Sequence, residues 1–340
     1  MDLKQLISSQ PIIGLSPLDG ITDEAFRLTQ CHFAKPDIIF TEFVSAEGLA
    51  HNAVKLYDHL LFLPEERPVI GQLFGKDPDS FYLAATILCH LGFDGIDINM
   101  GCPARTVTQH GSGAALIEKP ELASEIIKAV QQAVKNKTKL KDLKLKQKTI
   151  DKVETFRGTS LQNNNPTISV KTRLGINESV IETWIPFLLK HNLDFLTLHG
   201  RTLKQGYSGV ADWSEIQTAA NIAKTFNTPI LGNGDIKSRQ QGIEYCHKYG
   251  VNGVLIGRAA MGNPWVFSDH IATYAEKFAA MKFHTQKFID LFSGRRFEPL
   301  RRHFLLYTLG HPRAKELRLK ICQLTSIDQL LAIEANFLNC

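Results

Sequence analysis

The chain has 340 residues, of which 44% are hydrophobic and 21% charged, and its formal net charge at pH 7 is +5. This length suits one large domain and a small one, and no apolar run reaches the ~20 residues of a membrane-spanning helix, so we expect a globular protein without membrane segments. The six cysteines include no C-x-x-C pair and the N-terminus lacks the pattern of a signal peptide, which favours reduced thiols in the cytoplasm over a disulfide framework or a metal site.

Eight short apolar segments follow one another along the chain, each bounded by turn residues. They begin near residues 11, 37, 68, 93, 167, 194, 229 and 252. Helical patterns lie between most of them, so the chain is read as β/α units with a parallel sheet. Eight units over about 260 residues fit a closed (β/α)8 TIM barrel. An open doubly wound sheet is the alternative, but polar residues at the C-terminal end of nearly every strand favour the barrel, in which those ends converge.

The fourth unit contains the most informative stretch, residues 95–116, which reads GIDINMGCPARTVTQHGSGAAL. It starts as a buried strand and ends as a glycine-rich loop, with Asn99 and Cys102 between the two. Pro103 fixes the backbone after the cysteine, and Gly101 allows a flat ligand to approach the main chain closely. A small structural cysteine in a tight turn is the alternative. The polar and glycine residues around Cys102 favour a reactive thiol.

Two basic segments stand out from the rest of the chain. Residues 135–157 contain nine Lys or Arg and three acidic residues, and residues 295–320 contain eight and two. The first lies in an insertion at about 135–165 that breaks the β/α spacing, and we expect it to be partly disordered. The second lies in a helical region, 268–340, that follows a barrel of residues 1–267. A polyanionic partner such as RNA would explain both segments, as would chance clustering of solvated charges.

Polar residues at the strand ends form one candidate site. Glycine-containing loops after the last two strands, GNGD at 232–235 and IGR at 256–258, suit a phosphate group. Gln72, Lys171 and His199 could line a flat heterocycle such as a flavin. Seven strands that contribute together make a stronger signal than any single residue.

These motifs resemble the tRNA-dihydrouridine synthases. The matching pieces occur in family order over roughly residues 11 to 266 and include SPLDGITDEAFR, DINMGCPARTVTQHGSGAAL, VKTRLG, LHGRT and GNGDI. The resemblance implies a barrel that binds FMN, NADPH as the reductant, and a C-terminal helical domain that binds tRNA. One departure is that the family's first turn usually reads Pro-Met, where this chain has Pro17 and Leu18.

The resemblance also implies roles for individual residues. Cys102 matches the general acid that protonates the uracil ring. The implied FMN contacts are Pro17, Leu18, Asp19, Gln72, Lys171, His199, Asn233, Gly234, Asp235, Gly257 and Arg258. The implied substrate contacts are Asn99, Arg201 and Tyr207, and we expect tRNA phosphates to bind Arg295, Arg296, Arg301 and Arg302.

Two other functions remain open at this stage. A flavin-dependent barrel oxidoreductase that acts on a free pyrimidine, like the dihydroorotate dehydrogenases, would also place a cysteine near an asparagine, but it needs no basic helical region. A non-catalytic RNA-binding protein could keep the barrel as a scaffold. Such a protein would be colourless when purified.

Overall fold

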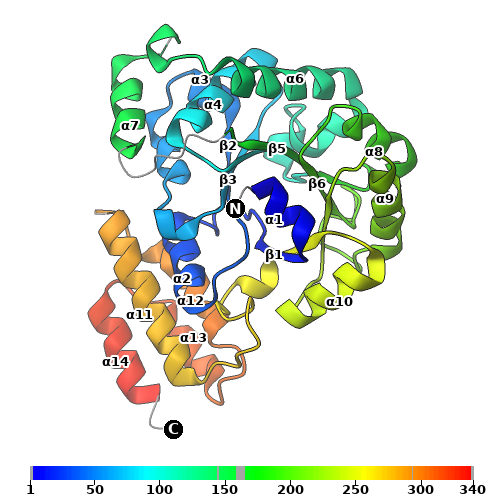
Figure 1. The fold of residues 1–340 in the computed structure, drawn as a ribbon. Coiled ribbons are helices and arrows are strands. Elements are labelled where there is room, and N and C mark those ends of the chain that lie inside the picture. The colour runs from blue at the N-terminus through cyan, green and yellow to red at the C-terminus, as the bar shows by residue number, and fades with distance from the viewer. Residues whose placement is uncertain (1–2, 144, 158–164, 293, 338–340) are drawn as a thin grey trace.

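The computed structural model describes residues 3–143, 145–157, 165–292 and 294–337. Eight parallel strands form a closed barrel in which each strand pairs with the next and β8 pairs with β1 (Figure 1). The strands are β1 Ile12–Leu15, β2 Ile39–Ser45, β3 Val69–Phe74, β4 Gly95–Met100, β5 Thr167–Arg173, β6 Phe195–His199, β7 Ile230–Asn233 and β8 Gly253–Ile256. The predicted (β/α)8 barrel is confirmed, and the open sheet is wrong.

Helices surround the barrel and alternate with its strands. They are α2 Glu24–Ala34, α3 Ala46–Ala50, α4 Pro78–Leu91, α5 Arg105–Thr108, α6 Pro120–Asn136, α8 Ile181–Leu189, α9 Trp213–Thr225 and α10 Arg239–Tyr249. The starts of several are fixed by side chains that accept hydrogen bonds from backbone N–H groups of the first turn, as Asp23, Asp77 and Ser238 do. Short 3-10 helices, η1 Val54–Leu60, η2 Pro64–Glu66, η3 Gly113–Glu118 and η5 Arg258–Ala260, complete the connections.

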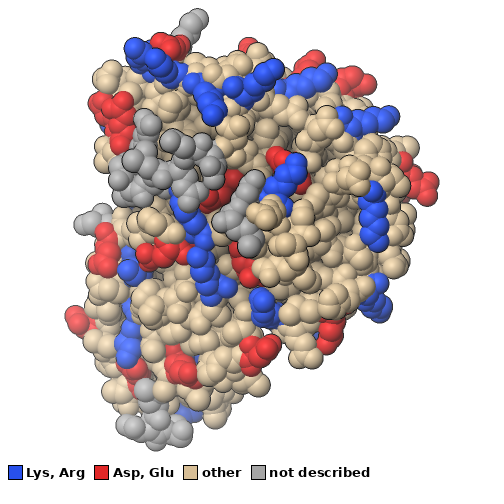
Figure 2. All heavy atoms as spheres, in the orientation of Figure 1, with Lys and Arg blue, Asp and Glu red and all other residues tan. Residues whose placement is uncertain are grey.

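The first helix, α1 Leu3–Ser9, closes the N-terminal end of the barrel (Figure 1). Leu3 and Ile7 pack in one apolar cluster with Phe40 and Phe195, which lie in the first half of their strands. Ligands must therefore enter from the other end, where the strands finish. On the face seen in Figure 2, Lys and Arg side chains are interspersed with Asp and Glu.

The lysine-rich insertion is partly a packed helix. After α6 the chain forms η4 Leu140–Asp142 and then α7 Gln147–Arg157, which lies against α4 and η1. Thr149 and Val153 are fully buried in this contact, and Lys152 forms an ion pair with Asp58 of η1 at 2.8 Å. Residues 147–157 of the insertion are therefore an ordered helix, because one face of that segment packs against the barrel. Residues 158–164 of the insertion lie outside the described residues.

In the part of the chain that the structure describes, four helices follow the barrel and form a second apolar core. They are α11 Tyr274–Leu291, α12 Glu298–Tyr307, α13 Ala314–Ile321 and α14 Ile327–Phe337. Their core includes Phe278, Phe304 and Phe337, together with Ala25 from α2 and Trp265 from the end of the barrel. The helical region therefore lies beside α2 at one side of the barrel (Figure 1). No helix within the described residues is long and apolar enough to cross a membrane.

Candidate active site

The turn that carries Cys102 follows β4 and is held from two sides. Asn99 Oδ1 accepts hydrogen bonds from the backbone N–H groups of Gly101 at 3.0 Å and Cys102 at 2.8 Å. On the other side, Arg173 Nε donates to the carbonyl oxygen of Gly101 at 2.6 Å. Cys102 is 9% exposed, and burial raises the pKa of its thiol. The sulfur is therefore protonated at neutral pH and held in a fixed turn at the open end of the barrel.

Arg173 belongs to the predicted polar strand ends, but the family resemblance gave it no role. It ends β5, and its Nη1 also donates to the carbonyl oxygens of Thr202 and Gly206, both at 3.1 Å. One guanidinium thus joins the Cys102 turn to the loop after β6. The sequence signal for it was its place in the VKTR strand end, but the carbonyl groups that it binds belong to loops far from it in the chain.

A chain of buried side chains leads away from the Cys102 turn into the barrel. Asn99 Nδ2 donates to Gln72 Oε1 at 2.9 Å, and Gln72 Nε2 donates to Asp97 Oδ2 at 2.7 Å. The second carboxylate oxygen of Asp97 accepts from Ser169 Oγ at 2.6 Å. Asp97 is fully buried, which raises its pKa to about 6. It is thus mostly ionised at neutral pH. Sequence reasoning missed Asp97 and Ser169, although a charged residue inside an apolar strand was a signal.

Lys171 and Asn233 meet across the barrel. Lys171 Nζ donates to Asn233 Oδ1 at 3.0 Å, and Asn233 Nδ2 donates to the carbonyl oxygen of Leu255 at 2.8 Å. Burial, together with the charge of Arg173, lowers the pKa of Lys171 to about 8. The ammonium is still mostly protonated at neutral pH, so it presents a positive charge and N–H donors to the interior of the barrel mouth.

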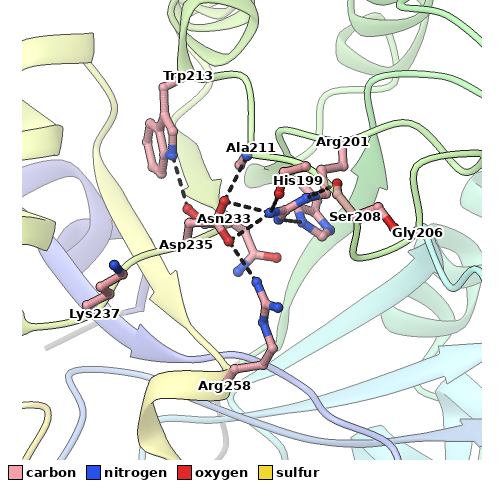
Figure 3. A network of polar contacts seen from close by, with 12 residues as sticks. His199, Arg201, Gly206, Ser208, Ala211, Trp213, Asn233, Asp235, Lys237 and Arg258 are labelled. Carbon is pink, nitrogen blue, oxygen red and sulfur yellow. Dashed lines mark hydrogen bonds and ion pairs between the residues drawn. The ribbon is translucent and has the colours of Figure 1, made fainter.

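His199 lies beside Arg201 in the network of Figure 3, and its imidazole ring is neutral. Its ring is 7% exposed, and burial together with the charges of Lys171, Arg173, Arg201 and Arg258 lowers its pKa far below the usual value. Arg201 Nη1 lies 3.3 Å from Nε2 of the ring. Because a guanidinium can only donate, Nε2 is the accepting nitrogen, and the ring proton is on Nδ1.

Asp235 joins two arginines at the end of β7 (Figure 3). Its carboxylate accepts from Arg201 Nη2 at 2.6 and 2.8 Å, from Arg258 Nη2 at 2.7 Å and from the N–H of Ala211 at 2.8 Å. Burial opposes ionisation, but the bonds from Arg201 and Ala211 outweigh it and lower the pKa of Asp235. Asp235 is therefore an anionic anchor for both guanidinium groups.

The two arginines differ in what they can reach. Arg201 is 1% exposed, and it also donates to the carbonyl oxygens of Ser208 at 3.2 Å and Gly209 at 2.7 Å. Arg258 has an exposed side chain, and its guanidinium carbon lies 5.6 Å from the ring centroid of Tyr207, which is itself 58% exposed. The predicted substrate contact Arg201 is thus enclosed by protein, whereas Tyr207 and Arg258 face solvent.

The remaining predicted residues lie at the rim or beyond it. Pro17, Leu18 and Asp19 follow β1, and a Cβ placed on Gly257 after β8 would lie 3.5 Å from Leu18 Cδ2. Gly234 has a positive φ of 131° that only glycine adopts readily. Together with the residues described above, these form one ring around the barrel mouth.

The four predicted RNA-binding arginines are not equivalent. Arg302 comes closest to the mouth, because a Cβ on Gly20 would lie 3.0 Å from its Nη1. Arg295 forms an ion pair with Asp58 at 2.9 Å, and Arg296 is exposed. Arg301 points inward, since its Nε donates to the carbonyl oxygen of Leu324 at 2.7 Å. Among the described residues, no group of three or more His, Cys, Asp or Glu side chains is arranged to hold a metal ion.

Known proteins are similar to this chain over nearly its full length. The dihydrouridine synthase family model matches residues 14–159 and 148–339. "Probable tRNA-dihydrouridine synthase" of Staphylococcus aureus (strain COL) is 31% identical over 337 residues, covering 96% of this chain and 93% of the relative. "Probable tRNA-dihydrouridine synthase 2" of Bacillus subtilis (strain 168) is 29% identical over 338 residues, covering 96% and 94%. The solved complex of 2-naphthoyl-CoA reductase has a similar fold, with a TM-score of 0.50 and 10% identity over 75% of this chain and 49% of that chain.

Proposed function

This chain belongs to the dihydrouridine synthase family, and we propose that it reduces the C5–C6 double bond of a uridine in tRNA, with FMN as its cofactor and NADPH as the reductant. The observation that carries the proposal is a protonated, buried thiol in a fixed turn at the open end of a barrel. Cationic and amide donors from three other strands, β3, β5 and β7, lie around that same opening.

The donor set at the mouth fits FMN. Lys171 and the neutral His199 offer polar atoms that suit the carbonyl oxygens and ring nitrogens of a flavin. Gln72 is fully buried and its amide is bound to Asn99 and Asp97, so its proposed role is to support the mouth from within the barrel. A phosphate group suits the end of β8, where Gly257 leaves room for close approach and Arg258 has an exposed guanidinium. Asp235 is an anion and would repel a phosphate. Its proposed role is therefore to orient Arg258, and its own side chain would make no direct contact.

Because the thiol is a proton donor, the proposed reaction takes its proton from Cys102 and its hydride from the flavin. When bound, FMN would supply the hydride that adds to C6 of the uracil. Cys102 would hold a proton and deliver it to C5, which is the action of a positioned general acid. Burial suits this role because it keeps the thiol protonated until the carbon needs the proton.

The mouth also presents groups that suit a nucleotide turned out of an RNA. Chemistry on a base requires that the base leave its stack, and an exposed aromatic ring offers it a new stacking partner. Tyr207 stands at the rim in that position, and Arg302 reaches the rim from the helical region. We propose that these two residues receive the target nucleotide, while Arg201 acts on it only through His199 and Asp235.

One reaction tests the whole proposal. Purified protein is denatured to identify any released flavin, and intact protein is then incubated with NADPH and tRNA from a strain that lacks the corresponding gene. We expect FMN to be released and one uridine of the tRNA to gain two hydrogen atoms by mass spectrometry. Oxidation of dihydroorotate without any change in tRNA would instead identify a free-pyrimidine oxidoreductase. A colourless protein that cannot be loaded with FMN would disprove the flavin assignment.

A further inference from the structure

The hydrogen bonds behind Cys102, which link Asp97, Gln72, Asn99 and the turn, all run from donor to acceptor in one direction. At one end are two backbone N–H groups, of Gly101 and Cys102, which can only donate hydrogen bonds. At the other end is the ionised carboxylate of Asp97, which can only accept them. Between the ends lie the amides of Gln72 and Asn99, and each of these carries one donating group and one accepting oxygen.

Only one arrangement of the two amides satisfies both ends. Gln72 must turn its NH2 group toward Asp97, and its oxygen then faces Asn99. Asn99 must then donate to that oxygen with its own NH2 group, so its own oxygen accepts from the backbone N–H groups of the Cys102 turn. If either amide flipped, donors would face donors inside the barrel, where an unmade hydrogen bond is costly. Gln72 is fully buried and Asn99 is 6% exposed, so water is a poor substitute.

We infer that Asp97 is a positioning residue for Cys102: its carboxylate sets the orientation of Gln72 and Asn99, and through them it fixes the turn that carries the thiol. The inference rests on the proposed role of Cys102 as a proton donor. Asp97 itself touches no reacting atom in this account. Ser169 donates to the second carboxylate oxygen, on the side of Asp97 away from the two amides.

Three substitutions separate this role from simple packing. Asp97→Leu keeps the branching of the side chain at Cγ but removes the acceptor for Gln72. Asp97→Asn keeps one oxygen for Gln72, and its NH2 group can donate to the hydroxyl of Ser169, so the direction of the chain is preserved. Ser169→Ala is the matched control, because it removes a hydrogen bond from the same carboxylate without touching the two amides.

Two measurements read the position of the thiol. The first is the alkylation rate of Cys102 by iodoacetamide, followed by peptide mass spectrometry, which needs neither flavin nor tRNA. The second compares the reduction of tRNA uridine by the pre-reduced enzyme with the reduction of the enzyme by NADPH. For Asp97→Leu we expect alkylation to rise and uridine reduction to fall, each by at least about tenfold. Reduction by NADPH should change by less than about threefold, and the other two variants should stay within about threefold of the original protein in every measurement.

The outcomes are distinct. Unchanged alkylation of Cys102 in folded Asp97→Leu would overturn the inference, as would an equal fall in both half-reactions. If Asp97→Leu does not fold, the double variant Asp97→Asn with Ser169→Ala replaces it, because the new amide then loses the partner that fixes its direction. That double variant must alkylate faster than both single variants for the inference to stand. If the original protein reduces no uridine, the proposed function fails, and alkylation still decides the role of Asp97.

Discussion

At Cys102, the chemistry depends on burial and on the turn that the chain makes there. Burial raises the pKa of the thiol, and the negative charge of Asp19 acts in the same direction. Cys102→Ala should therefore lower the rate of uridine reduction by roughly 10²-fold or more, the usual contribution of a positioned acid. Flavin content and reduction by NADPH should not change. Cys246→Ala, which alters another buried thiol on α10, is the control and should leave uridine reduction unchanged.

Arg201 and Arg258 share the carboxylate of Asp235 but have different exposure, so the same substitution should have different effects. Arg258 is largely exposed, and Arg258→Gln should weaken FMN binding by about tenfold, as expected for one lost charge-assisted bond to phosphate. Its melting temperature should hardly change, since exposed ion pairs contribute little to stability. Arg201→Gln should lower the melting temperature instead, because it leaves several buried acceptors unsatisfied. FMN titration measures the affinity for FMN, and thermal unfolding measures the melting temperature of each variant. If Arg258→Gln binds FMN as tightly as the original protein does, the phosphate assignment is contradicted.

Between elements, two buried histidines stand out at the contact of α11, α12 and α2. His284 and His303 are 0% and 1% exposed, their ring centroids lie 4.8 Å apart, and none of the four ring nitrogens has a hydrogen-bond partner among the described residues. Burial lowers the pKa of His284 to about 3 and that of His303 well below its usual value. Both rings are therefore neutral in the folded protein, and both take up protons when the chain unfolds in acid.

This pair predicts a loss of stability below pH ~6.5, the pKa of an unfolded histidine. Each ring should lower the unfolding free energy by up to ~1.4 kcal/mol per pH unit below that value. Glu24, whose pKa burial raises to about 7, acts in the opposite direction, because its folded form gains a proton as the pH falls. A comparison with His284→Leu/His303→Leu removes that contribution. Urea unfolding at about pH 5.5 and about pH 7.5 should show a smaller pH-dependent loss in the variant than in the original protein. Equal losses would show that the two rings are protonated in the folded state.

The elements show which features the sequence could predict. The eight strands were predictable because each one combines an apolar run with turn residues, and the polar strand ends followed from the parallel order. Helix α7 was not, because Thr149 and Val153 are the buried residues among those whose burial is described in it, and its partner, η1, lies far away in the chain. The hydrogen-bond partners of Arg201 could not be predicted either, because they are backbone carbonyl groups of a loop, which any residue type could supply.

For the molecule as a whole, the two basic segments meet at one acidic residue. Asp58 on η1 binds Lys152 of the insertion at 2.8 Å and Arg295 of the helical region at 2.9 Å. The insertion is thus attached to the barrel beside the helical region. Removing it would disturb this junction as well as any RNA contact. To compare how much each basic segment contributes to tRNA binding, the variants should therefore change exposed charges and keep the packed helix α7 in place.

Such a comparison gives a prediction about tRNA binding. Arg295, Arg296 and Arg302 are exposed on the helical region, and Arg302 also reaches the barrel mouth. Changing these three to Gln should weaken tRNA binding and reduce the slope of log K against log salt by up to about three, since each phosphate contact contributes ~0.9. Arg301 is left intact because its bond to Leu324 stabilises the helices. Reduction of the flavin by NADPH should continue in this variant.

The matched variant changes Lys141, Lys146 and Lys148, which are exposed on the insertion, to Gln. It removes the same charge, so non-specific attraction should fall equally in both variants. We expect a smaller loss of tRNA affinity and of salt slope here, because the insertion packs on α4 and η1 and meets the connection after β2 through the backbone N–H of Lys146, whereas the side chain of Arg302 itself lies against the turn after β1. Filter binding at several salt concentrations measures both variants. If the lysine variant loses the greater slope, the insertion is the main RNA surface, and the helical region contributes chiefly through its packing on α2.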